Sequence, residues 1–169
     1  MKFGYTGNFE ATPENQTKAA SWYEAGTDVI FSCGGLILNS VTAAAEADGS
    51  GKVIGVDVDQ QGESETVITS AMKMLSDTVY NALDAKEKGT FPGGQNDRLG
   101  IKEDAVGLPN DFSRFNSFDE AQYNVIYEKI KEDDNLLGNI KGNESEDGTE
   151  ITLADIKEIC PLIEIDEVN

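Results

Sequence analysis

The chain has 169 residues, of which 13 are basic and 32 acidic, giving a net charge of −19. This length suits one domain with its own core, so we expect a single α/β domain over residues 1–169. The acidic excess disfavours binding to nucleic acid or docking on an anionic membrane, because phosphate groups would be repelled. The sequence has no histidine, and its two cysteines, Cys33 and Cys160, lack metal-ligand spacing. We therefore expect no metal site and no cofactor.

No apolar run reaches the roughly 18 residues that a membrane-spanning helix needs. The chain does not begin with a basic and apolar signal peptide, and it goes directly into a strand-like segment. This abrupt start leads us to expect a piece of a longer protein.

The first part of the chain alternates between strand-like and helix-like segments. Residues 2–9 are extended in character, and Thr12 followed by Pro13 predicts a helix that begins there and ends at Gly26. Residues 28–35, "DVIFSCGG", then form an apolar strand that runs into two glycines.

Two helices and one strand are predicted next. Apolar residues at helical spacing indicate a helix over about 36–47, which is stopped by glycines. Residues 52–60, "KVIGVDVDQ", are a buried strand followed by two carboxylates. The strongest helical pattern covers about 65–88 and is closed by Gly89.

Short strands separated by helices of a dozen residues or more indicate βαβ units with parallel strands and right-handed crossovers. We therefore predict a three-layer αβα domain with a mainly parallel sheet. In this sheet the strands centred on Tyr5, Val29 and Ile54 are expected to be neighbours. Their carboxyl ends would then lie along one edge, which is where open α/β sheets bind ligands.

The second half of the chain is less regular. A weak strand or hairpin pattern covers 99–108, and "SFDE" at 117–120 is a capping box that predicts a helix through about Lys131. Residues 142–148 are typical of an exposed loop, and 152–161 of a short helix ended by proline.

Two acids and two glycines stand at the predicted strand ends. Asp57 and Asp59 would share a face if the strand continued, and paired carboxylates can serve acid–base chemistry, although exposed loop acids are much commoner. Gly34 and Gly35 let a ligand approach the backbone closely, but they do not form the dinucleotide-binding fingerprint.

An aromatic residue and a lysine complete the candidate set. Phe9 is either a core residue or a stacking surface, and composition favours the core. Lys73, which we place on the helix over 65–88, is either a surface lysine or a cation that reaches over the strand ends toward Asp57.

The segments "YTGNF", "AGTDVIFSCGG", "VIGVDVDQ" and "TVITSAMKML" occur in the order found in basic membrane proteins. This family of bacterial lipoproteins includes the purine-nucleoside receptor. The chain resembles it closely over residues 3–80, and more loosely through "LGIKEDAVGL" and the helix that follows. The resemblance implies a fold like that of type I periplasmic binding proteins, in which two lobes close on a ligand. It also implies that this chain holds mainly the carboxy-terminal lobe, without the amino-terminal lobe and the signal peptide.

The function that the resemblance implies is that of the substrate-binding component of an ABC importer. Such a protein binds a nucleoside, which we expect to be a purine nucleoside, and has permease and ATPase subunits as partners. The full-length protein would be held outside the cytoplasm by a lipid anchor. We expect no catalysis.

The resemblance also implies which residues bind the ligand. Phe9 would pack against the nucleobase, Gly34 beside Gly35 would allow the close backbone approach, and Asp57 would accept hydrogen bonds from ribose hydroxyls. Lys73 would donate to the sugar, a role that suits an ammonium beside a carboxylate. Asp59 ranks second to Asp57 as the acceptor.

Two other functions stay open. The same lobe would serve a sensory module that signals the presence of a ligand, although no basic DNA-binding segment supports a regulator. An enzyme using Asp57, Asp59 and Lys73 is the third reading, but it lacks an activated nucleophile and a cofactor fingerprint. A lobe without its partner would expose an apolar face, so we also expect self-association there.

Overall fold

The computed structural model describes residues 1–134 and 166–167. The chain divides into two compact units, a larger one over residues 8–125 and a smaller one made of 1–7 and 126–169. The predicted loop at 142–148 and the predicted helix at 152–161 lie outside the described residues.

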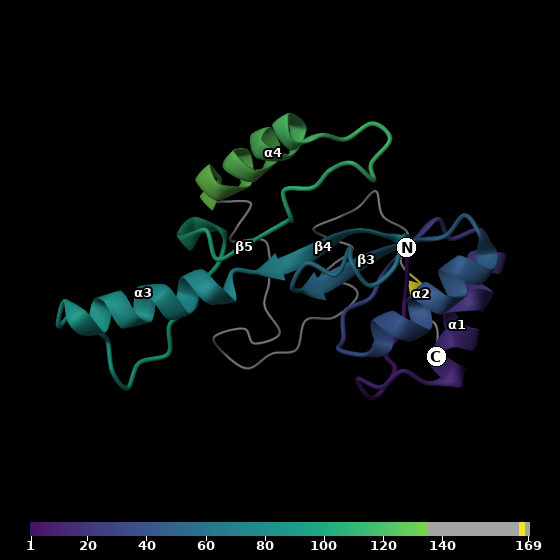
Figure 1. Ribbon diagram of the computed structural model, residues 1–169, viewed down its shortest axis with the longest axis horizontal. Coiled ribbons are helices and arrows are strands. Elements are labelled where there is room, and N and C mark those ends of the chain that lie inside the picture. The colour runs from purple at the N-terminus through teal and green to yellow at the C-terminus, as the bar shows by residue number, and fades with distance from the viewer. Residues whose placement is uncertain (135–165, 168–169) are drawn as a thin grey trace. The chain divides into compact units, whose positions relative to one another are not determined.

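The larger unit is built on a four-stranded sheet, in the order β2-β3-β4-β5. Figure 1 labels β3, β4 and β5. The strands are β2 (Val29–Phe31), β3 (Lys52–Asp57), β4 (Val67–Lys73) and β5 (Val106–Gly107). The first three are parallel, and β5 pairs antiparallel with β4. The predicted α/β class with a mainly parallel sheet is therefore confirmed.

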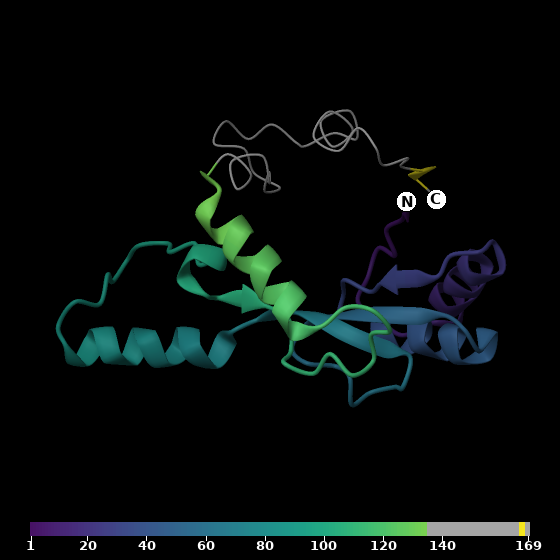
Figure 2. The same cartoon turned by 90° about the horizontal axis from the view of Figure 1, so that it is seen from above.

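Helices α1 (Pro13–Glu24) and α2 (Ile37–Asp48) lie side by side against this sheet (Figure 1 and Figure 2). Thr12 is the N-cap of α1 as predicted, and its hydroxyl accepts the backbone N–H of Asn15 at 3.2 Å. The buried apolar core joins both helices to the central strands and consists of Ala19, Tyr23, Ile30, Ile37, Leu38, Val41, Ala44, Ala45, Val53 and Val67.

The strand predicted around Tyr5 is wrong in both place and partner. Strand β1 covers only Lys2–Phe3, and it pairs with β6 (Asp166–Glu167) in a separate two-stranded sheet. Gly7 has a φ of +72° and takes the chain out of the extended conformation. The segment therefore does not form a neighbour of β2.

The helix predicted over 65–88 is wrong in its first part. Residues Val67–Lys73 form strand β4, and the helix α3 covers Leu75–Glu87. Three consecutive β-branched residues begin β4, and the side chains of Val67 and Thr69 are both buried, as expected for a strand. Lys73 consequently ends a strand and does not lie on a helix.

Helix α3 follows directly on from β4 and leads away from α1 and α2 in both views (Figure 1 and Figure 2). Among the described residues it buries none of its own side chains. Its apolar row of Leu75, Val79 and Leu83, at helical spacing, is more than half exposed. It is therefore an amphipathic helix without a described partner for its apolar face.

Helix α4 (Glu120–Glu132) extends close to the predicted end at Lys131, but its cap differs from the predicted one. Asp119 and Gln122 bond reciprocally, since each side chain accepts the backbone N–H of the other residue, at 2.9 Å and 3.1 Å. The capping box is thus formed two residues later than the predicted Ser117–Glu120 pair. The weak pattern at 99–108 becomes a short 3-10 helix (Ile101–Glu103) and β5.

Candidate functional site

The carboxyl ends of β2, β3 and β4 lie along one edge of the sheet because the three strands are parallel. Just past β2, the backbone N–H of Ser32 donates to the carbonyl of Ile54 at 2.9 Å, which fixes the register of the two strands. Asp57, at the end of β3, is paired with Met72 of β4, next to Lys73. The strand ends therefore gather the predicted candidates from three separate segments.

Asp57 and Lys73 form an ion pair at this edge, with Oδ1 of the carboxylate 2.7 Å from the ammonium nitrogen. Oδ1 is buried although the Asp57 side chain is 48% exposed, which leaves the other carboxylate oxygen open to solvent. The carboxylate, as acceptor and as opposite charge, raises the pKa of Lys73.

The backbone of Asp57 is unusual. Its φ is +70°, and the N–H of Val58 donates across it to the carbonyl of Val56 at 2.8 Å. A hydrogen bond between residues i and i+2 around a positive φ defines the rare and strained form of the γ-turn. Strained backbone of this kind is concentrated at ligand-binding and catalytic positions.

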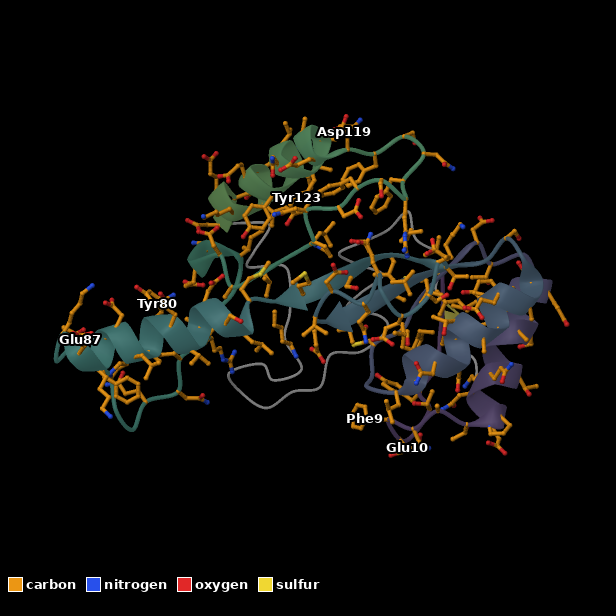
Figure 3. The ribbon with its side chains drawn as sticks, in the orientation of Figure 1. Phe9, Glu10, Tyr80, Glu87, Asp119 and Tyr123 are labelled. Carbon is orange, nitrogen blue, oxygen red and sulfur yellow. The ribbon has the colours of Figure 1, made fainter. Side chains whose placement is uncertain are left out.

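Phe9 packs against the glycine pair. A Cβ atom on Gly34 would come within 3.2 Å of the Phe9 ring, and one on Gly35 within 3.1 Å of the Phe9 Cβ. The N–H of Leu36 donates to the Phe9 carbonyl at 2.9 Å and holds the two segments together. Phe9 is 70% exposed, so the core reading is wrong and its ring remains available for stacking (Figure 3).

Cys33 directly precedes Gly34, just past the end of β2, and its side chain is exposed. The structure thus brings Phe9 to the glycines and Asp57 to Lys73, along the same edge of the sheet.

Asp59 occupies a different environment from Asp57. Strand β3 ends at Asp57, so the condition for the two carboxylates to share a face, a strand that continues to Asp59, is not met. Asp59 is exposed, and its Oδ1 accepts the backbone N–H of Gln61 at 3.1 Å within the loop between β3 and β4.

Two residues of the site were not singled out by sequence reasoning. The Gln60 side-chain oxygen accepts the N–H of Val56 at 2.8 Å, and the Gln60 N–H donates to the Ser70 hydroxyl at 3.0 Å. Both residues lie in the quoted segments "VIGVDVDQ" and "TVITSAMKML". The signal that could have identified them is a polar side chain within or next to a buried strand.

The loop that carries Asp59 is held from outside by Arg114. One nitrogen of its guanidinium lies within 2.7–2.9 Å of the carbonyl oxygens of Gln61, Ser64 and Val67. This basic residue is therefore structural and stabilises the connection between β3 and β4.

The edge offers a carboxylate oxygen as acceptor, an ammonium as donor, an exposed aromatic ring and a glycine backbone. Within residues 1–134 and 166–167, no group of three or more acidic, cysteine or histidine side chains could hold a metal ion. In the same part of the chain, no helix combines the length and apolar character needed to cross a bilayer. The groups present suit a neutral polar ligand with hydroxyl groups and a flat ring.

The fold is that of a lobe of the type I periplasmic-binding-protein kind. A crystal structure of ABC transporter solute-binding proteins from Aeropyrum pernix K1 has the same fold, with a TM-score of 0.51 and 23% identity. The matched region covers 95% of this chain and 46% of the Aeropyrum chain. A transcriptional activator of the comK gene from Bacillus halodurans also shares the fold, with a TM-score of 0.60, 18% identity and coverage of 75% and 43%.

The sequence identifies the family. The family described as ABC transporter substrate-binding protein PnrA-like matches residues 1–144, and this chain belongs to that family. The chain is 31% identical to the ABC transporter nucleoside-binding protein BmpA of Lactococcus lactis over 75% of its own length and 42% of the relative's. It is 33% identical to basic membrane protein D of Borreliella burgdorferi, over 74% and 36%. The chain therefore spans less than half the length of these relatives, and the resemblance to basic membrane proteins is confirmed.

Proposed function

We propose that this chain is the nucleoside-binding lobe of an ABC-importer substrate-binding protein. The observation that carries the proposal is the Asp57–Lys73 ion pair at the carboxyl edge of the sheet, with one carboxylate oxygen left open. A carboxylate only accepts hydrogen bonds and an ammonium only donates them, so together they match the vicinal hydroxyls of a ribose.

The nucleobase would lie on Phe9. This ring is exposed at the same edge, and the glycines beneath it leave room for the ring itself to pack closely on the backbone. The Lactococcus relative is named as nucleoside-binding, which supports this class of ligand. We propose a purine nucleoside, because the larger ring buries more surface on the aromatic side chain.

The partners follow from the family. The whole protein would pass its ligand to permease and ATPase subunits without chemical change, and it would be held at the outer side of the membrane by a lipid anchor. A second lobe would supply the other half of the ligand's contacts. In the absence of that second lobe, the exposed apolar side chains of this chain would favour self-association.

Titration of the 15N-labelled chain with nucleosides, followed by NMR, tests the proposed function. This method detects the weak binding that a single lobe is expected to have. Adenosine, guanosine, inosine, cytidine and uridine should shift the amide signals of Phe9, Gly34, Asp57 and Lys73, with the purine nucleosides binding more tightly. Free ribose should shift the Asp57 and Lys73 signals only. An unchanged spectrum with every nucleoside at millimolar concentration would contradict the proposal.

A further inference from the structure

The strained backbone of Asp57 requires a local cause. A γ-turn with positive φ persists only where the surrounding contacts over-determine it. Asp57 ends a strand whose next residue, Val58, is exposed, so packing beyond the turn does not hold it. Besides the pairing of Asp57 with Met72 and its ion pair with Lys73 on β4, contacts to the turn come from the residues on either side of it.

Gln60 supplies one of these contacts. Its side-chain oxygen accepts the N–H of Val56 at 2.8 Å, and Val56 is the residue whose carbonyl closes the turn around Asp57. The side chain of Gln60 therefore ties the chain after the turn to the residue before it. Between these two points, Asp57 has little freedom to leave the left-handed conformation.

Ser70 on the neighbouring strand fixes Gln60 in turn. The Gln60 N–H donates to the Ser70 hydroxyl at 3.0 Å, and Ser70 is completely buried. A Cβ atom at Gly55 would lie 2.5 Å from the Gln60 oxygen and 2.7 Å from the Ser70 hydroxyl. Only glycine leaves the space that both groups occupy, so Gly55, Gln60 and Ser70 form one arrangement beneath the turn.

We propose that Gln60 is a positioning residue for ligand binding, which acts through Asp57 and is itself held by Ser70. This proposal rests on the proposed function, because the ligand contact it serves is that of Asp57. The bond from Val56 to Gln60 keeps Asp57 in its γ-turn, and the turn directs one carboxylate oxygen toward Lys73 and the other toward the ligand. Gln60 itself need not touch the ligand.

The neighbouring Gln61 provides a matched control. Its side-chain amide donates to the carbonyls of Ile68 at 2.9 Å and Asp111 at 3.2 Å, so it anchors the same loop. Its side chain has no described bond to β3 or to the turn around Asp57. A purely structural role of the loop would make the two glutamines equivalent for ligand binding.

The test is a double-mutant cycle with adenosine as the probe. Gln60→Met keeps the length of the side chain and removes the acceptor, and it should weaken adenosine binding roughly fivefold, the effect of one lost hydrogen bond. In an Asp57→Ala background the same substitution should have little further effect. Gln61→Met should lower the melting temperature, because it removes two hydrogen bonds of a buried side chain. It should leave the affinity within about twofold, because these bonds do not reach the turn around Asp57. Ser70→Ala should repeat the coupling to Asp57 that Gln60→Met shows.

A measurement without ligand separates this proposal from the proposed function. The carboxyl 13C signal of Asp57 should shift in Gln60→Met and in Ser70→Ala, and should stay unchanged in Gln61→Met. If no nucleoside binds to the wild-type chain, the proposed function fails while this signal still decides the role of Gln60. An Asp57 signal identical to wild type in Gln60→Met, or affinity losses that simply add in the double variant, would overturn the positioning role.

Discussion

The ammonium group of Lys73 lies 2.7 Å from the carboxylate of Asp57, although the two residues end different strands. The pair stands at the edge of the sheet where parallel strands finish together, and it is more exposed than a structural ion pair would be. An exposed pair of this kind contributes little to stability. Its position therefore supports the proposed ligand contact better than a role in stabilising the fold.

The first prediction concerns the carboxylate itself. Asp57→Asn keeps a residue that tolerates the left-handed backbone and removes the charge. It should weaken nucleoside binding by about 1.5–3 kcal/mol, the range for a hydrogen bond to a charged group, or roughly tenfold or more. The melting temperature should hardly change. Titration calorimetry or NMR measures the affinity, and wild-type affinity in Asp57→Asn together with a loss in Asp59→Asn would assign the contact to Asp59.

The second prediction concerns the protonation of Lys73. Its raised pKa, caused by Asp57, means that the folded chain holds this proton more tightly than the unfolded chain does. The ion pair should therefore be intact at neutral pH and be lost only as the pH rises through the raised pKa, above the ordinary lysine value of about 10.4. The 13Cε signal of Lys73 followed over pH measures this. In Asp57→Asn the pKa should fall; an identical titration in both proteins would exclude the pair in solution.

The sequence was sufficient to predict those elements around the site for which neighbouring residues all indicate the same secondary structure. Thr12 and Pro13 mark a helix start that depends on neighbouring residues alone, and the apolar segment before Asp57 is too short and too flanked by polar residues to be a helix. The carboxyl edge followed from the alternation of strands and helices. This alternation predicts Gly34 and Asp57 near the edge, whereas Phe9 is expected there through a strand around Tyr5 that does not belong to the main sheet.

The remaining features depend on contacts that sequence patterns do not reveal. Apolar residues in 65–88 satisfy both the helical and the strand period, and the choice for Val67–Lys73 is made by pairing with β3. The left-handed turn at Asp57 depends on Gln60 and Ser70, which lie in different parts of the sequence. Among the described residues, the segment around Tyr5 pairs with no strand of the main sheet, and nothing in its local pattern indicates this.

The third prediction concerns the loop between β3 and β4. Arg114→Met removes the donor that three backbone carbonyls share, and these partly buried groups would then lose their partner. The free energy of unfolding should fall by at least about 1.5 kcal/mol. Urea denaturation measures it. Lys88→Met, which removes an exposed pair with Asp84 on α3, is the control and should change stability by less than about 1 kcal/mol.

The fourth prediction concerns self-association. The row of Leu75, Val79 and Leu83 on α3 is exposed among the described residues, and so are Val29 and Phe31 on β2. We expect a second copy of the chain to cover these apolar side chains, giving dimers in light scattering at high concentration. Val79→Lys should restore the monomer. Asn81→Lys adds the same charge on the opposite side of the helix and should leave the dimer intact, and a wild-type chain that is monomeric at every usable concentration would refute the idea.

The fifth prediction concerns Tyr23, which joins α1 to the start of β3. Its hydroxyl donates to the carbonyl of Lys52 at 2.9 Å, and the ring belongs to the buried core. Burial, with a smaller contribution from the charge of Asp48, raises the pKa of the Tyr23 phenol. The folded chain therefore favours the neutral phenol, and the stability this provides is complete below the ordinary tyrosine value of about 10 and is lost as the pH rises above it.

Tyr23→Phe tests both parts of this argument. The substitution keeps the ring and removes the hydroxyl, so it should cost about 0.5–1.5 kcal/mol at neutral pH, the net value of one hydrogen bond. Above pH 10 the variant should lose less stability with rising pH than the wild-type chain does, because it has no phenol to ionise. Urea denaturation at pH 7 and at several alkaline values measures the two effects. Parallel stability curves over the whole alkaline range would show that ionisation of Tyr23 is not linked to folding.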